Sequence, residues 1–165
     1  MSRGKTLGGI TALAAIAVLA LTLVPAQSAG GATERFRVCD QNHPGYEHDV
    51  DNGEDGFSAG DQFMFVDKLL DPATGRKAGR DSGTATIVRV IHGQDALVHI
   101  EAMFYFPNGK ISVFFAARFG DLDEGQFFPI TGGTGHYENA TGSVFIKNHP
   151  CDGESGTSFH FHVQP

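Results

Sequence analysis

Asp67 is the residue whose neighbours most clearly suggest chemistry. It lies in Gly60–Leu70 (GDQFMFVDKLL), whose alternation is typical of a β-strand and places Phe63, Phe65 and Asp67 on one face. A carboxylate among phenylalanines costs free energy unless a partner group compensates for its burial. Two interpretations follow: Asp67 pairs with an arginine inside the core, or it faces a polar group of a bound ligand.

Histidines offer a second kind of chemistry. His160 and His162 alternate on one face of the predicted strand Ser158–Val163, a spacing that is compatible with zinc binding. The apolar residues beside them face the core, so we interpret the two histidines as surface residues. The acidic loop Gln41–Gly60 lacks the ligand spacing of an EF-hand. We therefore assign no metal ligand and expect no cofactor.

The chain contains two cysteines, Cys39 and Cys151. In an exported protein the oxidising surroundings favour a disulfide between them, and two unpaired buried thiols are the alternative. The bond would close a loop of about 110 residues, which the chain-entropy model values at ~4–5 kcal/mol.

The first segment, Met1–Ala32, is typical of a secretory signal peptide. Arg3 and Lys5 form its positive start, and Leu7–Val24 carries no charge. A membrane anchor is the competing interpretation, because this run is nearly long enough to span a bilayer. Pro25 and the small polar residues after it favour cleavage. We therefore expect a secreted protein that has no membrane contact once the signal is removed.

The remaining residues, 33–165, have the length of one domain. They hold all 19 acidic residues and 10 basic ones (12 in the chain, less two in the signal), a net charge of −9. This balance argues against a nucleic-acid partner. Short alternating segments, many glycines and no long helical periodicity indicate an all-β barrel or sandwich. We expect strands at Glu34–Asp40, Gly60–Leu70, Gly83–His92, the two arms of the hairpin Ala96–Gly120, Ser143–Asn148 and Ser158–Val163.

The hairpin Ala96–Gly120 is the longest regular pattern in the chain. An Asn108-Gly109 pair accepts the positive φ angles of a two-residue type I′ turn, which would place Phe106 opposite Ile111. Side-chain alternation then gives one wholly apolar face, formed by Val98, Ile100, Ala102, Phe104, Phe106, Ile111, Val113, Phe115, Ala117 and Phe119.

The opposite face of this hairpin is mixed. It carries Met103, Tyr105 and Phe114 among polar residues, which is more apolar than a fully solvated face requires. Two interpretations remain open: a surface with scattered apolar side chains, or an interface with another copy of the chain.

A glycine-rich stretch follows the hairpin. Gly132, Gly133 and Gly135 suggest a nucleotide-binding loop, but Glu138 stands where the third glycine of that motif belongs and no amphipathic helix follows. We interpret the stretch as a tight irregular connection.

Three stretches of the chain resemble the allene oxide cyclase and dirigent-protein superfamily. They are GDQFMFVDKLLDPATGRKAGRDSGTATIV (Gly60–Val88), the turn PNGKISV (Pro107–Val113) and the loop ITGGTGHYENATG (Ile130–Gly142). The resemblance covers roughly Phe36–Ile146, without Gln41–Phe57. It implies a single antiparallel eight-stranded β-barrel with a hydrophobic cavity, usually oligomeric. Members of this superfamily steer a reactive intermediate into one cyclised or coupled product.

The same resemblance bears on the site. It places Ala117, Asp67 and Ala85 where the plant cyclases have an inward tyrosine, asparagine and cysteine, while their glutamate and a second asparagine fall near Arg37 and Cys39. Plant-type allene oxide cyclisation is therefore not expected, although the barrel pattern is retained.

The interior implied by this matching is mostly apolar with a few polar groups, as small-molecule sites are. Packing that merely fills a small barrel is the alternative for each phenylalanine. The candidate catalytic residues are Asp67, Arg89 and Arg37, and the candidate ligand-binding residues are Phe63, Phe65, Asp67, Phe104, Phe115, Ala117 and Phe119.

The sequence thus predicts a secreted barrel that binds an unidentified apolar small molecule and associates as a trimer or dimer. Three function classes remain open: an isomerase-like cyclase or dirigent-like guide, a non-catalytic carrier, and a structural or interaction barrel with a packed interior. An internal cavity would separate the first two classes from the third. Turnover of a ligand would separate the first from the second.

Overall fold

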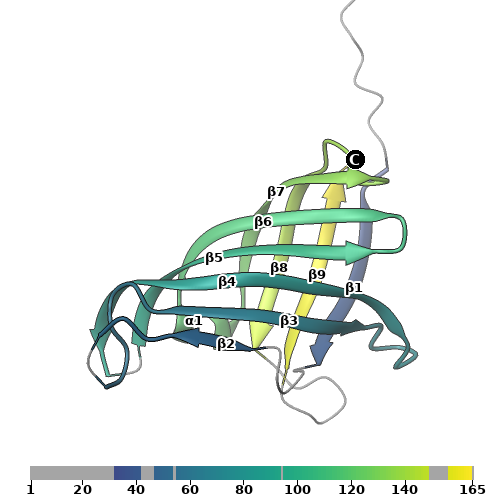
Figure 1. Ribbon diagram of the computed structural model, residues 1–165. Helices are drawn as coiled ribbons and strands as arrows, with labels where there is room; N and C mark the ends of the chain where they lie inside the picture. Colours follow the sequence, from purple (N-terminus) through teal and green to yellow (C-terminus); the bar gives the residue numbers. More distant parts are fainter. Residues whose placement is uncertain (1–31, 42–46, 54, 94, 149–155, 165) are drawn as a thin grey trace, which may run out of the picture.

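The computed structural model describes residues 32–41, 47–53, 55–93, 95–148 and 156–164. The predicted signal lies outside these residues except for Ala32, so it stays a prediction. The described chain forms nine strands and one short helix: β1 (Glu34–Gln41), β2 (His48–Val50), β3 (Gln62–Leu70), β4 (Lys77–His92), β5 (Asp95–Phe106), β6 (Gly109–Arg118), α1 (Phe119–Glu124), β7 (Gln126–Gly135), β8 (Thr141–Asn148) and β9 (Thr157–Gln164) (Figure 1).

Eight of these strands close into an antiparallel barrel in the order β1-β9-β8-β7-β6-β5-β4-β3, with β3 returning to β1. Closure depends on β1, because its residues Glu34–Cys39 pair with β9 and its last residues, Cys39–Gln41, pair with β3. The short β2 pairs with the other end of β3. The predicted eight-stranded antiparallel barrel is confirmed.

The hairpin of β5 and β6 is confirmed, but its turn lies one residue earlier than predicted. Pro107 and Asn108 form the turn, Phe104 pairs with Ile111, and neither Asn108 nor Gly109 has a positive φ. The fixed φ of proline suits the first position of a common turn, which replaces the predicted type I′ turn. The pairing therefore shifts by two residues, so every side chain keeps its predicted face.

Strand β7 was not predicted, because its glycines were interpreted as an irregular connection. Its first half pairs with β8 and its second half with β6. A Cβ at Gly133 would lie 2.2 Å from the carbonyl oxygen of Tyr137, and one at Gly109 would lie 2.2 Å from that of Thr134. Gly109 therefore allows close approach of the paired strands β6 and β7, and Gly133 allows the turn after β7 to fold back onto the strand.

Strand β4 begins at Lys77, six residues before the predicted start at Gly83. The preceding turn is confined to the residues around Asp71, whose carboxylate accepts hydrogen bonds from the Ala73 N–H (2.8 Å) and the Thr74 hydroxyl (3.0 Å). Helix α1 and strand β2 were also not predicted. No helix in the described part of the chain is long and apolar enough to cross a membrane.

The Gly60-Asp61 pair fixes the approach to β3. Asp61 is buried, and its carboxylate accepts hydrogen bonds from the backbone N–H groups of Asn52 (2.9 Å) and Ser58 (2.7 Å). A charged acceptor for two loop amides explains why an aspartate stands at this buried position.

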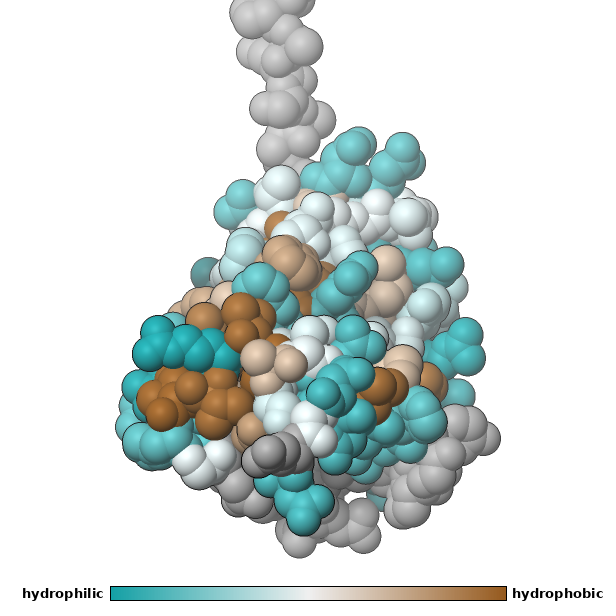
Figure 2. All heavy atoms as spheres, turned by 60° about the vertical axis from the view of Figure 1, so that its left-hand side comes forward, coloured by the Kyte–Doolittle hydropathy of each residue, from teal (hydrophilic) through white to brown (hydrophobic). Residues whose placement is uncertain are grey.

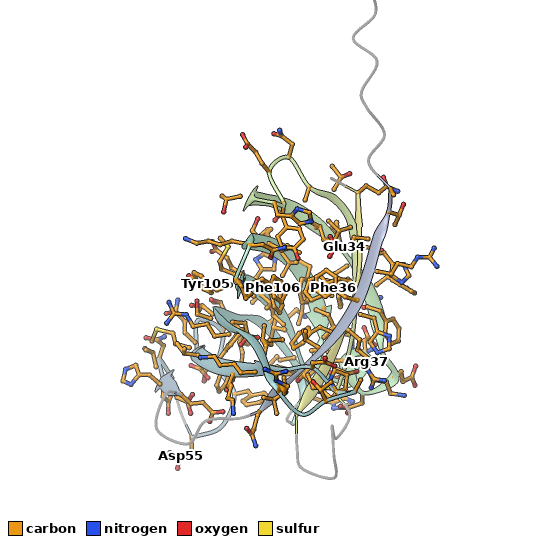
Figure 3. All side chains as sticks on the ribbon, turned by 90° about the vertical axis from the view of Figure 1, so that its right-hand side faces the viewer. Glu34, Phe36, Arg37, Asp55, Tyr105 and Phe106 are labelled. Atoms are coloured by element: carbon orange, nitrogen blue, oxygen red, sulfur yellow. The ribbon has the colours of Figure 1, made fainter. Side chains whose placement is uncertain are left out.

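Aromatic rings fill the end of the barrel where β1 begins. The ring of Phe36 stacks on Phe161 with centroids 4.9 Å apart and meets Phe106 edge to face at 5.3 Å. Figure 3 shows Phe36 and Phe106 side by side in the interior. This end is solid core. Cys39 is buried in β1, whereas Cys151 lies outside the described residues, so their disulfide stays a prediction.

Candidate functional site

A cavity of about 160 Å³ lies near the other end of the barrel, where β1 and β8 end and β9 begins. Strands on both sides of the barrel contribute to it, and Leu122 of α1 closes part of its wall. The described residues that line it are Asp40, Phe65, Asp67, Asp81, Ile100, Ala102, Phe104, Val113, Phe115, Leu122, Ile146, Asn148, Thr157 and Phe159.

Phenylalanine rings form much of the apolar wall. Phe104 meets Phe159 edge to face at 5.0 Å, and Phe115 stacks on Phe128 with centroids 3.7 Å apart. Ala102 lies on the same inward face of β5 as Phe104. Its small side chain leaves room that a larger one would occupy. The wall is therefore rigid and apolar, as small-molecule sites are.

Three aspartates converge on this apolar wall. Asp67 of β3 and Asp81 of β4 are paired directly across the two strands, with exposed fractions of 6% and 1%. Asp40, at the end of β1, lines the same cavity and accepts a hydrogen bond from the backbone N–H of Thr157. We call these three residues the aspartate cluster.

Asp81 is the least satisfied member of the cluster. Its Oδ1 atom is buried and has no hydrogen-bond partner in the described structure. A buried acceptor without a partner is unfavourable and rare in folded proteins. Because Asp81 lines the cavity, a group that enters the cavity and reaches this carboxylate can satisfy it.

Burial and mutual repulsion shift the acidity of the cluster. Burial first, and then the charges of Asp40 and Asp67, raise the pKa of Asp81 from 3.8 to about 7, while backbone hydrogen bonds from Asp81 and Asp67 oppose the shift. Burial likewise raises the pKa of Asp40 to about 6, while the hydrogen bond from Thr157 opposes the shift. Carboxyl groups with such pKa values exchange protons near neutral pH and mark candidate functional sites.

The cluster can hold a proton, take a proton from a bound molecule, or face a positive charge. Among the described residues, no three or more histidine, cysteine or acidic side chains are arranged to bind a metal ion. We therefore consider its chemistry toward an organic ligand.

Four of the predicted site residues are brought together at the cavity: Phe65, Asp67, Phe104 and Phe115. Ala117 lies on the same inward face and is buried, but it does not line the cavity. The two others form a separate aromatic group near α1.

That group contains Phe63 and Phe119, whose ring centroids lie 6.3 Å apart, and Phe57, which contacts both. Together they pack on Ile87 and Val98. The geometry thus gives Phe63 and Phe119 a packing role outside the cavity.

The two arginine candidates are wrong as interior residues. Arg37 is exposed because its neighbours Phe36 and Val38 take the inward direction on β1. Arg89 is exposed as well, because an irregularity in pairing between Ile87 and Arg89 shifts the alternation of β4. Neither arginine lines the cavity.

Sequence reasoning did not find Asp40 and Asp81. Asp40 ends the predicted first strand, and Asp81 falls before the predicted start of β4, so neither was assigned a face. Extending β4 back to Lys77 would have placed Asp81 on the inward face, and the observed pairing with β3 sets it opposite Asp67. Strand length was therefore the missing signal.

Two places on the outer surface are apolar. Val88 and Ile91 are exposed near the end of β4, and Figure 2, which brings this side forward, shows hydrophobic side chains gathered in a patch. Phe114 of β6 is 53% exposed, and beside it Met103 lines a groove over β4–β7. The predicted interface on this mixed face stays a prediction.

Comparison with known proteins gives similarity in structure alone, because no family model and no curated protein matches the sequence. A pyocyanin demethylase structure superposes with a TM-score of 0.66 at 21% identity, over 79% of this chain and 99% of that one. The Diels-Alderase AbmU from Streptomyces koyangensis gives 0.63 at 19% identity, over 84% and 70%. The pterocarpan synthase dirigent protein GePTS1 gives 0.61 at 17%, over 80% and 86%. The chain therefore has the allene oxide cyclase/dirigent-like barrel fold.

Proposed function

We propose that this protein is a secreted barrel that binds an apolar small molecule in its interior and guides its cyclisation or isomerisation. The observation that carries the proposal is the cavity that combines phenylalanine walls with the aspartate cluster. A cavity of about 160 Å³ is comparable to an engineered apolar cavity that holds benzene. The part of the ligand inside it is therefore about the size of one substituted ring.

The walls and the cluster have separate roles in this proposal. Rigid walls limit the conformations of a bound molecule, so that its reacting atoms are held close together. Asp67 and Asp81 stabilise positive charge that develops as bonds rearrange, because fixed charges in an apolar site act strongly. Arg37 and Arg89 are exposed and take no part in this role.

Structures of similar fold support a reaction of this kind. One belongs to a cyclase described as catalysing a [4 + 2] cycloaddition, and others belong to Diels-Alderases and dirigent proteins. A non-catalytic carrier would use the same cavity without chemical change. A packed structural barrel is disfavoured, because the cavity is larger than a methyl group.

Binding is tested with ethylbenzene, which matches the cavity in size and carries no charge. We expect it to raise the melting temperature of the wild-type protein. Ala102→Leu fills the cavity and should abolish this shift. Ala116→Leu makes the same change at an exposed position of the neighbouring strand and should leave it intact. Equal shifts in both variants, or none in the wild type, would contradict binding at this site.

Catalysis is tested without knowledge of the substrate, because cyclisation and isomerisation do not change molecular mass. We expect the culture medium of a deletion strain to lose one compound and gain another of identical mass and different retention time. The wild-type gene should restore the original compound, and a gene carrying Asp81→Leu should not. A deletion strain with no such pair of isomers would favour the carrier.

A further inference from the structure

We propose that the ligand of this cavity is an organic cation, a protonated amine carried on an aromatic or other apolar body. The inference rests on the proposed function, because it names the chemical class of molecule that the same cavity binds. The ammonium group would contact the aspartate cluster, and the apolar body would lie against the phenylalanine walls.

The first argument is the unpaired oxygen of Asp81. Asp81 is 1% exposed, lines the cavity, and has an Oδ1 atom without a hydrogen-bond partner among the described residues. An ionised carboxylate only accepts hydrogen bonds, and an ammonium group only donates them. An ammonium group in the cavity that reaches the Asp81 carboxylate, with the side chain turned so that Oδ1 faces the cavity, would therefore form a charge-assisted bond with it.

The second argument is the sign of the charge around the cavity. The acidic groups that raise the pKa of Asp40 are Asp67 and Glu47, and those that raise the pKa of Asp81 are Asp40 and Asp67. The described lining residues include no lysine, arginine or histidine. When Asp40 and Asp81 are ionised, a cation in the cavity reduces the repulsion among the carboxylates of the cluster, which a neutral ligand does not.

The third argument is the aromatic wall. Phe65, Phe104, Phe115 and Phe159 line the cavity together with the aspartates. Aromatic faces attract cations as well as apolar groups, and cavities lined by aromatic rings are a known way to bind ammonium ligands. The wall therefore suits both halves of the proposed molecule.

Proton linkage gives the proposal a specific signature. The pKa values of about 6 for Asp40 and about 7 for Asp81 mean that the cluster gains negative charge between pH 5.5 and pH 8. A cation should therefore bind more tightly as the pH rises through this range. A neutral ligand that accepts a hydrogen bond from a protonated aspartate would show the opposite trend.

The experiment compares benzylamine with ethylbenzene, which have nearly the same shape. Benzylamine is protonated throughout this pH range, whereas ethylbenzene is neutral. Titration calorimetry should show that benzylamine binds at least tenfold more tightly at pH 8 than at pH 5.5, while ethylbenzene binding changes little. Asp81→Asn should weaken benzylamine binding at pH 8 at least tenfold and leave ethylbenzene binding unchanged. Asp49→Asn, which removes an exposed carboxylate, is the matched control.

The possible outcomes separate this inference from the proposed function. If ethylbenzene binds and benzylamine binds no more tightly at pH 8 than at pH 5.5, the proposed cation is refuted while the apolar site stands. The same holds if benzylamine binds more tightly in acid. If neither compound binds the wild-type protein, the proposed function fails and this inference fails with it. Asp40→Asn provides a second test should Asp81→Asn not fold, and it should reduce the pH dependence of benzylamine binding.

Discussion

Replacing Asp81 by asparagine should make the protein less sensitive to alkaline pH. Asparagine has nearly the same shape as aspartate but stays neutral, so the change removes the ionisation and little else. In the folded protein the pKa of Asp81 is raised to about 7, chiefly by burial, against an ordinary value of 3.8. Between pH 3.8 and about 7, the folded protein therefore keeps a proton that the unfolded chain releases.

The sign and size of the effect follow from linkage. Because the folded state binds more protons between pH 3.8 and about 7, the free energy of unfolding falls as the pH rises through that range. Each pH unit corresponds to about 1.4 kcal/mol for one proton. The part of this range above pH 5 spans about two pH units. Ionisation of Asp81 should therefore lower the free energy of unfolding of the wild type by ~3 kcal/mol between pH 5 and pH 8.

Urea denaturation at pH 5 and pH 8 measures this difference. We expect the wild type to lose ~3 kcal/mol more than Asp81→Asn over this interval, so that the variant is the more stable protein at pH 8. Asp49→Asn serves again as the exposed control and should follow the wild type. Parallel pH profiles for the wild type and Asp81→Asn would refute the assigned burial and repulsion.

Three further predictions concern the rest of the molecule. Phe114→Glu should dissociate the predicted oligomer without unfolding the protein, whereas Phe127→Glu, at another exposed position, should leave the oligomer intact. Light scattering that finds a wild-type monomer at micromolar concentration would contradict the predicted oligomer. Mass spectrometry of the non-reduced secreted protein should show Cys39 and Cys151 paired, and loss of the bond should cost a few kcal/mol; two free thiols would exclude the pairing. Asp61→Ala should destabilise the protein by about 1–3 kcal/mol in urea, because two part-buried N–H groups lose their acceptor, whereas the exposed Asp55→Ala should have little effect.

The barrel could be predicted from the sequence because its strongest local patterns agree with the final fold. Alternation along β5 and β6 gave the inward face correctly even though Pro107 moved the turn, since a shift of two residues preserves the side of each side chain. The glycine-rich β7 was missed for the opposite reason. Its glycines have low strand propensity, and their need for close backbone contact is visible only when the partner strands are in place.

The site could be predicted only in part. Asp67 was found because it alternates with phenylalanines within one regular strand. Asp81 lies in a stretch without clear periodicity, and only its pairing with β3 places it beside Asp67. Arg89 was expected in the interior, but the irregularity of β4 between Ile87 and Arg89 turns it outward. Local pattern does not reveal contacts between distant segments.

The two ends of the barrel argue against an interior that serves packing alone. At the end where β1 begins, Phe36, Phe106 and Phe161 pack ring against ring, so this fold can fill its interior with hydrocarbon. At the other end, strands β1, β3 and β4 present three aspartates to a cavity. Asp81 ionises there at a cost in folding stability at neutral pH, which an apolar residue would avoid. A feature that opposes stability at one end, beside a well-packed core at the other, is expected of a site that acts on a ligand.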